Sequence, residues 1–396
     1  MKISNRVARM SPSATAEMAA KALEKKKRGL HVVSFTTGEP DYDSPSSAQD
    51  YAFRAIKDGK THYPPTQGIP ELRRAAAEYY REHFGLSYES NEVVVGTGAK
   101  QLIYSALGCL IDPGDEVLIL SPAWVSYVEQ IGLFDGVPVK VDTSDTDYIP
   151  DLVRIENART PRTRAIIINS PNNPTGVVYT SETLRAIGKL AKARNIFIIN
   201  DEVYERLVYS EGTSPQILKE CPDLRDQVLN VNGVSKSFAM TGWRIGYALG
   251  PAELIKAISD IQGHVTSGAS SISQWASVGA LTGGQEDCEK MRVGFEARRN
   301  LIVDLLSEIP GVGFRRPNGA FYVFVDIRGF LRPNVPSLAD DVAFCLELLD
   351  KKNVGMVPGS AFLCPGYVRI SYSCSEADIR EGVKRFAEFV SEVTKG

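Results

Sequence analysis

Hydrophobic and polar residues follow one dominant pattern along the middle of this 396-residue chain. From about residue 46, helical stretches alternate with short, unbroken apolar runs rich in β-branched residues. Such runs are typical of strands buried on both faces of a mostly parallel sheet, and their alternation with helices favours a doubly wound α/β domain. The seven expected strands are residues 93–95, 117–120, 137–141, 165–168, 196–199, 228–231 and 245–249.

The pattern changes near residue 285. A long charged helix is expected over residues 286–308, and the apolar alternation of residues 319–326 predicts a half-exposed strand. A helix over residues 338–351, a strand over residues 367–371 and a final amphipathic helix from Glu376 follow. These elements indicate a smaller α+β domain in the C-terminal part of the chain.

The N-terminal segment is expected to join this smaller domain. It contains a predicted helix over residues 13–30 and a short predicted strand over residues 31–35. A chain of this length usually needs more than one hydrophobic core. The expected division is an N-terminal arm (1–12), a first part of the small domain (13–45), a large domain (46–284) and a second part of the small domain (285–396).

Composition argues against several classes of function. The 45 basic and 48 acidic residues give a net charge of -3, which supports neither a nucleic-acid nor a membrane partner. Six scattered cysteines without a C-x-x-C pair fit a reducing cytoplasm. The four histidines lack metal-binding spacing, so no metal site is expected. The first residues lack the apolar segment of a signal peptide, so a cytoplasmic location is expected.

Polar residues that could carry chemistry follow the expected strands, at the edge where open α/β sheets bind ligands. Lys236 follows one strand, and a lysine amine can form a Schiff base with a carbonyl cofactor. A lone lysine is more often a surface residue, so the residues around Lys236 must decide between a surface lysine and a cofactor-binding one. Asp201 ends another strand and could keep a pyridine nitrogen protonated, while Tyr204 could reach a phenolic oxygen on the same ring. A helix N-cap is the alternative for Asp201.

Two loops add further candidates. The turn Ser-Pro-Asn-Asn-Pro-Thr-Gly, residues 170–176, is rigid and presents Asn173 from a preset position. The segment Gly-Thr-Gly-Ala-Lys-Gln, residues 96–101, opens a helix whose N-terminus could attract a phosphate. Ser235 and Arg244 could bind the same phosphate.

Trp124 and Arg369 have both structural and functional interpretations. Trp124 could stack on an aromatic ring or simply pack in the core. Arg369 lies in the apolar run 367–371, where an arginine is costly unless it is paired. A substrate carboxylate would pair it in a bidentate way. A structural salt bridge or an outward strand face is the alternative for Arg369.

Together these residues resemble the class I/II aminotransferases of pyridoxal phosphate (PLP) fold type I, over essentially the whole chain. Asn173 and Asp201 lie 28 residues apart, and Asp201 and Lys236 lie 35 apart, in the family's order. The matching motifs are Ser-Lys-Ser-Phe-Ala-Met-Thr-Gly-Trp-Arg-Ile-Gly (235–246), the turn at 170–176, Asp-Glu-Val-Tyr (201–204) and Gly-Glu-Pro (38–40). Within the family, Gly-Ala-Lys-Gln (98–101), Ser-Pro-Ala-Trp-Val-Ser-Tyr (121–127) and residues 266–275 are most similar to bacterial and plastid aspartate aminotransferases, a branch with prephenate-using members.

The resemblance implies the PLP-dependent transferase fold, with a mostly parallel seven-stranded sheet in the large domain, and it assigns a role to each matching residue. Lys236 would carry PLP and shuttle a proton, Asp201 would pair the pyridinium, and Tyr204 would bind the ring oxygen. The other implied cofactor contacts are Asn173 at that oxygen, Trp124 on the ring face, Gly98, Ala99, Lys100, Ser235 and Arg244 at the phosphate, and Tyr63 from the neighbouring subunit of a homodimer. The implied substrate contacts are Gly38, Trp124, Asn173 and Arg369, with Ser13, Thr15 and Lys100 near a second carboxylate.

The implied reaction is transamination of L-aspartate with 2-oxoglutarate to oxaloacetate and L-glutamate, by a ping-pong mechanism. Prephenate-using relatives carry a lysine where this chain has Ser11, and a tyrosine is usual where it has Ala123. Aminotransferases for prephenate, aromatic amino acids or alanine, and PLP-dependent carbon–sulfur β-lyases, share the core motifs and stay open as alternatives. A PLP-sensing regulator is disfavoured because the slightly acidic chain has no evident DNA-binding module. An α/β binding protein without PLP is the remaining alternative.

Overall fold

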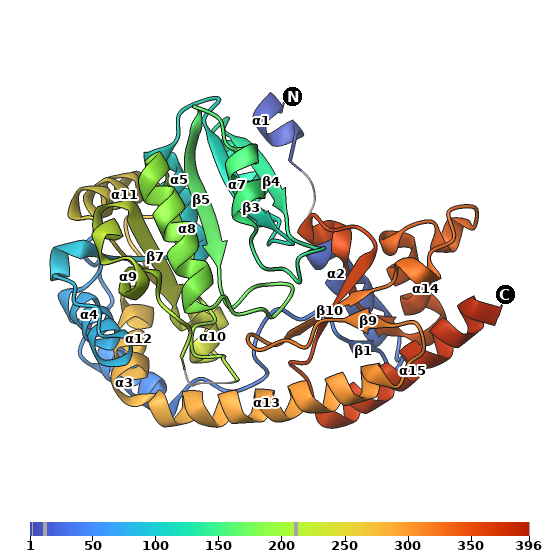
Figure 1. The fold of residues 1–396 in the computed structure, drawn as a ribbon. Coiled ribbons are helices and arrows are strands. Elements are labelled where there is room, and N and C mark those ends of the chain that lie inside the picture. The colour runs from blue at the N-terminus through green and yellow to red at the C-terminus, as the bar shows by residue number, and fades with distance from the viewer. Residues whose placement is uncertain (2, 11–13, 210–212, 396) are drawn as a thin grey trace.

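The computed structural model describes residues 1, 3–10, 14–209 and 213–395, and of residues 14–16 it describes the backbone alone. A seven-stranded sheet forms the centre of the larger part of the molecule, with strand order β2-β8-β7-β6-β5-β3-β4 (Figure 1). Only β8 runs antiparallel to its neighbours, so the expected mostly parallel sheet is confirmed. The strands are β2 (Val93–Gly96), β3 (Glu116–Ser121), β4 (Val137–Asp142), β5 (Thr163–Asn169), β6 (Phe197–Asp201), β7 (Val228–Gly233) and β8 (Gly246–Leu249).

Alternate residues of these strands pack against helices on opposite faces of the sheet. In β3, Leu118 and Leu120 share a core with helices α4, α8 and α12, whereas Val117 and Ile119 share another with α5, α6 and α11. Both faces are therefore buried, which explains the unbroken apolar runs. The helices of this part are α3 (Ser46–Lys57), α4 (Pro70–Phe84), α5 (Ala99–Leu110), α6 (Ser126–Leu133), α7 (Leu152–Ala158), α8 (Ser181–Arg194), α9 (Ile217–Glu220), α10 (Val234–Ser237), α11 (Ala252–Val265) and α12 (Ser271–Gly283).

A further core lies between a four-stranded antiparallel sheet, of order β12-β13-β10-β9, and the helices around it. A short parallel pair, β1 and β11, adds to it. Its elements are α2 (Ala14–Lys27), β1 (Val33–Ser34), α13 (Gln285–Ser307), β9 (Gly313–Phe314), β10 (Tyr322–Asp326), α14 (Asp341–Lys352), β11 (Val354–Gly355), β12 (Val357–Pro358), β13 (Tyr367–Ser371) and α15 (Glu376–Lys395).

The remaining helices are short. They are α1 (Asn5–Ala8) and the 3-10 turns η1 (Ser90–Glu92), η2 (Pro222–Gln227), η3 (Thr241–Trp243), η4 (Arg328–Phe330), η5 (Pro336–Leu338) and η6 (Gly359–Phe362). No helix within the described ranges has both the length and the apolar character needed to cross a membrane.

Strand β10 corrects one expectation from the sequence. The alternation predicted a half-exposed strand, but Tyr322, Val323, Phe324 and Val325 are all fully buried. Val323 and Val325 belong to the core around α14 and α15. On the opposite face, Phe324 packs with Tyr148 from the large sheet's side of the molecule. The face that the pattern assigned to solvent is thus covered by the other part of the chain.

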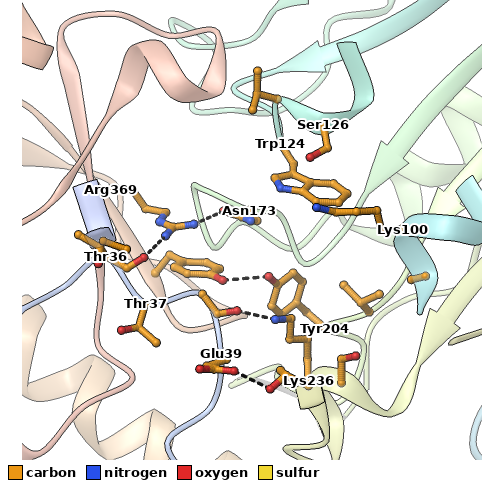
Figure 2. A pocket seen from close by; sticks show the side chains of 18 of the residues that line it. Thr36, Thr37, Glu39, Lys100, Trp124, Ser126, Asn173, Tyr204, Lys236 and Arg369 are labelled. Carbon is orange, nitrogen blue, oxygen red and sulfur yellow. Dashed lines mark hydrogen bonds between the residues drawn. The ribbon is translucent and has the colours of Figure 1, made fainter. Parts of the chain in front are cut away.

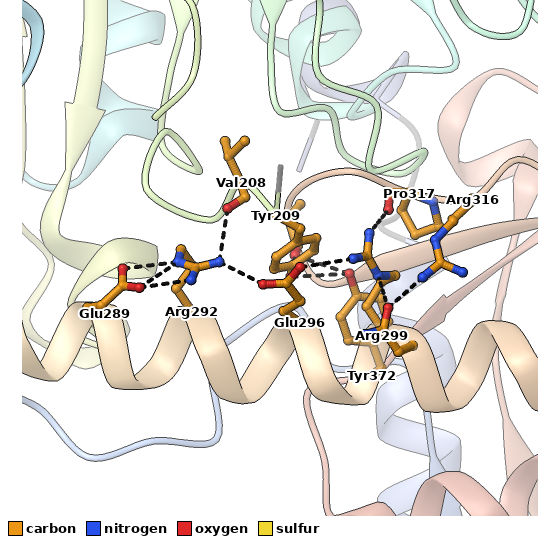
Figure 3. Close-up of polar contacts among 11 residues, drawn as sticks. Val208, Tyr209, Glu289, Arg292, Glu296, Arg299, Arg316, Pro317 and Tyr372 are labelled. Carbon is orange, nitrogen blue, oxygen red and sulfur yellow. Dashed lines mark hydrogen bonds and ion pairs between the residues drawn. The ribbon is translucent and has the colours of Figure 1, made fainter. Parts of the chain in front are cut away.

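Helix α13 runs along both parts of the molecule and contacts each through arginines (Figures 1 and 3). Arg292 pairs with Glu296 and donates to the carbonyl of Val208, in the segment after β6. Arg299 is 7% exposed and donates to the carbonyl of Pro317 at 2.7 Å. The helix is therefore fixed by directional polar contacts to loops on both sides.

Candidate active site

A cavity of about 810 Å³ lies at the carboxyl ends of the large sheet's strands, where the two cores meet. The sequence-predicted residues that line it are Gly38, Ala99, Lys100, Trp124, Asn173, Asp201, Tyr204, Ser235, Lys236, Arg244 and Arg369. Figure 2 shows several of these side chains pointing toward one another from distant segments of the chain. The fold therefore brings most of the predicted site residues to one place.

Lys236 lies in the short helix α10, directly after β7. Its Nζ donates to the carbonyl oxygen of Gly38 at 2.5 Å, and both residues line the cavity. Burial lowers the pKa of Lys236 to about 8, with Arg369 and Arg244 acting in the same direction and Glu39 and Asp201 opposing them. A substantial fraction of the amine is therefore neutral near physiological pH, which a nucleophilic lysine requires.

Asp201 ends β6 and is buried. Its Oδ2 accepts a hydrogen bond from the hydroxyl of Tyr127 at 2.5 Å. Burial raises the pKa of Asp201 to about 6, although Tyr127, the N–H of Val203 and Lys236 pull it down. In the part of the chain that the structure describes, no cation lies within ion-pair distance of this carboxylate. Tyr127 was not among the predicted site residues. It is the last residue of the matching segment 121–127, three positions after Trp124.

Arg369 lies on β13 and is 2% exposed. Its Nη2 donates to the carbonyl of Thr36 at 2.9 Å and its Nη1 to Oδ1 of Asn173 at 3.1 Å (Figure 2). Its Nε has no hydrogen-bond partner, and among the described residues no carboxylate lies close enough to form an ion pair with it. A buried guanidinium with an unused donor is costly, so this arginine is poised for an anion from outside the chain.

Tyr204 donates to, or accepts from, the hydroxyl of Tyr322 at 2.9 Å. The ring of Tyr322 lies 4.4 Å from the guanidinium carbon of Arg369, so it also stabilises that cation. Burial raises the pKa of Tyr204 well above its usual value, which keeps the hydroxyl protonated. Tyr322 was missed because its apolar run was interpreted only as a strand of the small domain.

The opposite end of the cavity has the features of an anion site. Gly98 caps the N-terminus of α5 with φ +84°, and a Cβ added there would lie 2.6 Å from Nη2 of Arg244. Arg244 is itself in the left-handed region, with φ +55°, and its Nη1 donates to the carbonyl of Thr241. Ser235 also lines the cavity. A helix N-terminus, an arginine fork and a hydroxyl together suit a phosphate.

Trp124 and Lys100 lie next to each other in the cavity wall. The Nζ of Lys100 is 4.6 Å from the centre of the Trp124 ring, a cation–π distance. The indole packs edge-on against Tyr127, which holds its orientation. Burial, and secondarily Arg244, lowers the pKa of Lys100. An indole and a cation that lies over it thus form part of the cavity wall.

The other residues singled out in the sequence differ in what the structure says of them. Tyr63 is 90% exposed and does not line the cavity of its own chain. Ser11 and Ser13 lie outside the described residues. Thr15 belongs to α2, but its side chain is not described. Ala123 is buried beside Trp124.

Comparison with known proteins agrees with this geometry. The aminotransferase class I and II family matches residues 31–386. The aspartate aminotransferase of Geobacillus stearothermophilus is 42% identical over 98% of this chain and 99% of its own length. The aspartate/prephenate aminotransferase of Thermus thermophilus is 42% identical over 97% of this chain and 98% of its own.

A solved structure is similar along its whole length. The aspartate aminotransferase from Thermus thermophilus with maleate superimposes with a TM-score of 0.92, at 42% identity, over 98% of this chain and 99% of that one. Sequence, fold and the convergence of charged side chains on one cavity lead to the same conclusion: the chain belongs to the class I and II aminotransferase family and is an aminotransferase with the type I fold.

Proposed function

We propose that this chain transfers the amino group of L-aspartate to 2-oxoglutarate with PLP as its cofactor, giving oxaloacetate and L-glutamate. One observation carries the proposal. The amine of Lys236 and the carboxylate of Asp201 face one cavity that has an anion site at one end and the unpaired Arg369 at the other. A phosphate-bearing aromatic cofactor and an amino acid together match this distribution of charge.

The side chains present fit PLP. Ser235, Arg244 and the backbone around Gly98 and Ala99 would hold the phosphate. Asp201, buried and without a cation of its own, would pair a protonated ring nitrogen. Tyr204 and Asn173 would bind the ring oxygen, and Trp124 would cover one ring face. When bound, PLP supplies an electron sink that stabilises negative charge at the substrate's α-carbon.

Lys236 would carry out the proton transfer. Once released from the cofactor, its Nζ can take the proton from the α-carbon, because an amine whose pKa is about 8 accepts and returns protons readily near neutral pH. Arg369 and Asn173 would fix the substrate's α-carboxylate, with the Gly38 segment beside it. This clamp keeps the α-hydrogen directed toward Lys236 and so contributes to the rate by orientation.

The acidic substrate rests on two further arguments. Lys100 offers a second cation next to Trp124 in the cavity that Arg369 also lines, so Arg369 can be reserved for the α-carboxylate. Relatives at 42% identity are named aspartate or aspartate/prephenate aminotransferases, and one was solved with maleate, a dicarboxylate. Ser13 and Thr15 are proposed to assist Lys100 at the distal carboxylate.

We also propose a homodimer with shared active sites. Tyr63 is almost fully exposed in the single chain, and a large aromatic residue in that state is well suited to contact another molecule. In the proposed dimer, its hydroxyl reaches the phosphate in the neighbouring subunit's site.

The test is a panel of amino donors, followed by the absorbance of the bound cofactor as it gains the amino group. We expect L-aspartate and L-glutamate to react fastest. Lys236→Ala should lose turnover by several orders of magnitude, since it removes both the attachment point and the proton carrier. Aspartate and glutamate failing to react, with prephenate-derived, aromatic or sulfur-containing donors reacting instead, would reject the proposed substrate. Full turnover by Lys236→Ala would reject the mechanism.

Lys100→Ala tests the distal contact. We expect kcat/KM for L-aspartate to fall by about 10- to 100-fold, the value of one charged hydrogen bond, with little change for L-alanine. Steady-state kinetics with both donors at saturating PLP gives the comparison. An equal loss with both donors would instead place Lys100 at the phosphate.

A further inference from the structure

Glu205 is a fully buried carboxylate that does not line the cavity. It lies in the turn after β6. Its Oε1 accepts from the hydroxyl of Tyr79 at 2.6 Å, and its Oε2 accepts from the hydroxyl of Ser237 at 3.0 Å. Tyr79, on α4, and Ser237, at the end of α10, are buried as well. Each oxygen of the carboxylate therefore holds a different element of the fold.

The two turns that Glu205 joins carry the central groups of the cavity. Glu205 directly follows Tyr204, and its N–H donates to the carbonyl of Glu202 in the turn that begins after Asp201. Ser237 directly follows Lys236. The hydrogen bond from Ser237 to Glu205 is therefore a side-chain link between the segment that presents Asp201 and Tyr204 and the segment that presents Lys236.

Burying a carboxylate at this position costs free energy. Burial raises the pKa of Glu205, while the hydrogen bonds from Tyr79 and Ser237 and the nearby charge of Arg206 oppose that rise. An apolar side chain of similar size would cost less. The carboxylate instead provides two directional contacts. It accepts hydrogen bonds on both oxygens, and the hydroxyls of Tyr79 and Ser237 are the donors.

The largest charge effects on the pKa of Lys236 come from Glu39, Arg369, Arg244 and Asp201, all of which line the cavity. Glu205 lies outside the cavity and is linked to the α10 turn through its hydrogen bond with Ser237.

We propose that Glu205 is a positioning residue that fixes Lys236 relative to Asp201 and Tyr204, by bonding Ser237 on one oxygen and Tyr79 on the other. The inference rests on the proposed function, because the position matters only if Lys236 and Asp201 act on the same bound cofactor. Displacements of about 1 Å in such arrangements cost up to about 100-fold in rate.

The experiment compares Glu205→Ala and Glu205→Gln in the PLP-loaded enzyme, with Glu116→Ala as the matched control. Glu116 is another buried glutamate that accepts from two hydroxyls, Thr160 and Thr163. It lies at the start of β3, at the edge of the sheet opposite the cavity. Three quantities are measured: kcat and KM for L-aspartate, the dissociation constant of PLP, and the pH midpoint of the bound cofactor's absorbance, which reports on the nitrogen contributed by Lys236.

For Glu205→Ala we expect kcat to fall by about 10- to 100-fold, while KM stays within about twofold because Arg369 and Asn173 are untouched. The absorbance midpoint should move by about half a pH unit or more, and PLP should bind more weakly. Glu205→Gln keeps the length and the planar end, and Ser237 can reverse its hydrogen bond, so its kcat should stay within about threefold of the unmodified enzyme. Glu116→Ala should change stability alone.

If Glu205→Ala does not fold, Ser237→Ala and Tyr79→Phe each remove one of the two bonds at little cost in volume. Ser237→Ala should then lower kcat by about 3- to 10-fold and move the absorbance midpoint, and Tyr79→Phe should do so less. Three results would overturn the inference: a Glu205→Ala enzyme with kcat and midpoint like those of Glu116→Ala, a change in KM alone, or equal damage in Glu205→Gln. In each case, loss of turnover in Lys236→Ala would still support the proposed function. An active Lys236→Ala would contradict both the proposed function and the positioning role of Glu205.

Discussion

Burial brings the pKa values of Lys236 and Asp201, two residues that line the cavity, closer together. The pKa of Lys236 falls to about 8 and that of Asp201 rises to about 6. In both cases the low dielectric around the group disfavours its charged form. Without a cofactor, Asp201 is therefore a carboxylate held in an unfavourable place, and a protonated ring nitrogen would supply the charge that it lacks.

Asp201→Asn should stabilise the cofactor-free protein at pH 7.5 while it abolishes most of the activity. Because the pKa of Asp201 is about 6 in the folded chain and 3.8 ordinarily, the folded state binds more protons between these values. Stability contributed by this group is thus lost as pH rises from about 4 to 6, by up to about 3 kcal/mol. Asparagine avoids this loss but weakens the contact with the N–H of Val203, so we expect a net gain of about 1 to 2 kcal/mol.

Urea unfolding at pH 4 and pH 7.5 measures this gain. The difference between Asp201→Asn and the unmodified protein should be present at pH 7.5 and close to zero at pH 4. In the presence of PLP the order should reverse, because the ligand stabilises only the protein that binds it tightly. A variant that is less stable at both pH values would show that Asp201 is not under electrostatic strain.

The candidate residues themselves were largely predictable, but their partners were not. Lys236, Asp201 and Arg369 could be found because charged residues at strand ends or in apolar runs conflict with burial unless they have a task. Tyr322 and Tyr127 carry no such conflict, since a tyrosine in an apolar segment packs well without any function. Their roles depend on contacts between residues that are far apart in the sequence. Tyr204 and Tyr322, for example, are separated by 118 positions.

At the scale of elements, hydrophobic pattern predicted the strands of the large sheet well and failed at β10. A strand such as β3 is buried on both faces by helices, so its apolar run is continuous. The second face of β10 is covered by Tyr148, which lies far away in the chain. Alternation reports local amphipathicity and contains no information about what covers the second face.

Helix α13 offers a test of whether its arginines hold the two parts of the molecule together. Arg299 is 7% exposed, donates to the carbonyl of Pro317, and lies 4.8 Å from the ring centre of Tyr209 (Figure 3). Arg299→Ala should lower the free energy of unfolding by about 2 to 3 kcal/mol, since it removes packing and leaves a buried carbonyl without its donor.

Lys290→Ala is the matched control on the same helix. Lys290 pairs with Glu286, and both side chains are mostly exposed. Because exposed ion pairs contribute little, this change should stay within about 0.5 kcal/mol. Chemical denaturation of the two PLP-loaded variants gives the comparison. Equal, small effects would mean that α13 is held by its apolar contacts alone.

At the scale of the whole molecule, one chain holds an almost complete set of candidate groups. Among the candidates whose side chains the structure describes, Tyr63 is the exception, because it is exposed and outside the cavity of its own chain. Neither hydrophobic pattern nor a single folded chain can show where a residue of a second copy lies. The proposed homodimer explains this exception, because a two-fold axis places each subunit's Tyr63 at the other's site.

Mixing two variants that are each impaired at limiting PLP tests this arrangement. Lys236→Ala removes the lysine from its own site, and Tyr63→Ala weakens phosphate binding in the partner's site. In a mixed dimer both defects then fall in the same site, and the other site is complete. Random exchange of subunits makes about half of the dimers mixed, so about a quarter of all sites should recover. Activity at limiting PLP, measured after the subunits are exchanged in dilute denaturant, should rise toward that fraction.

The pair Lys236→Ala and Arg369→Ala provides the control, because both residues line the cavity of one chain. In their mixed dimer each site keeps one defect, so activity should stay at the level of the separate variants. Recovery with the first pair and none with the second places Tyr63 across the subunit boundary. No recovery with either pair, in samples whose mixed dimers are verified by mass, would mean that each chain works with its own residues alone, and the exposed Tyr63 would then need another explanation.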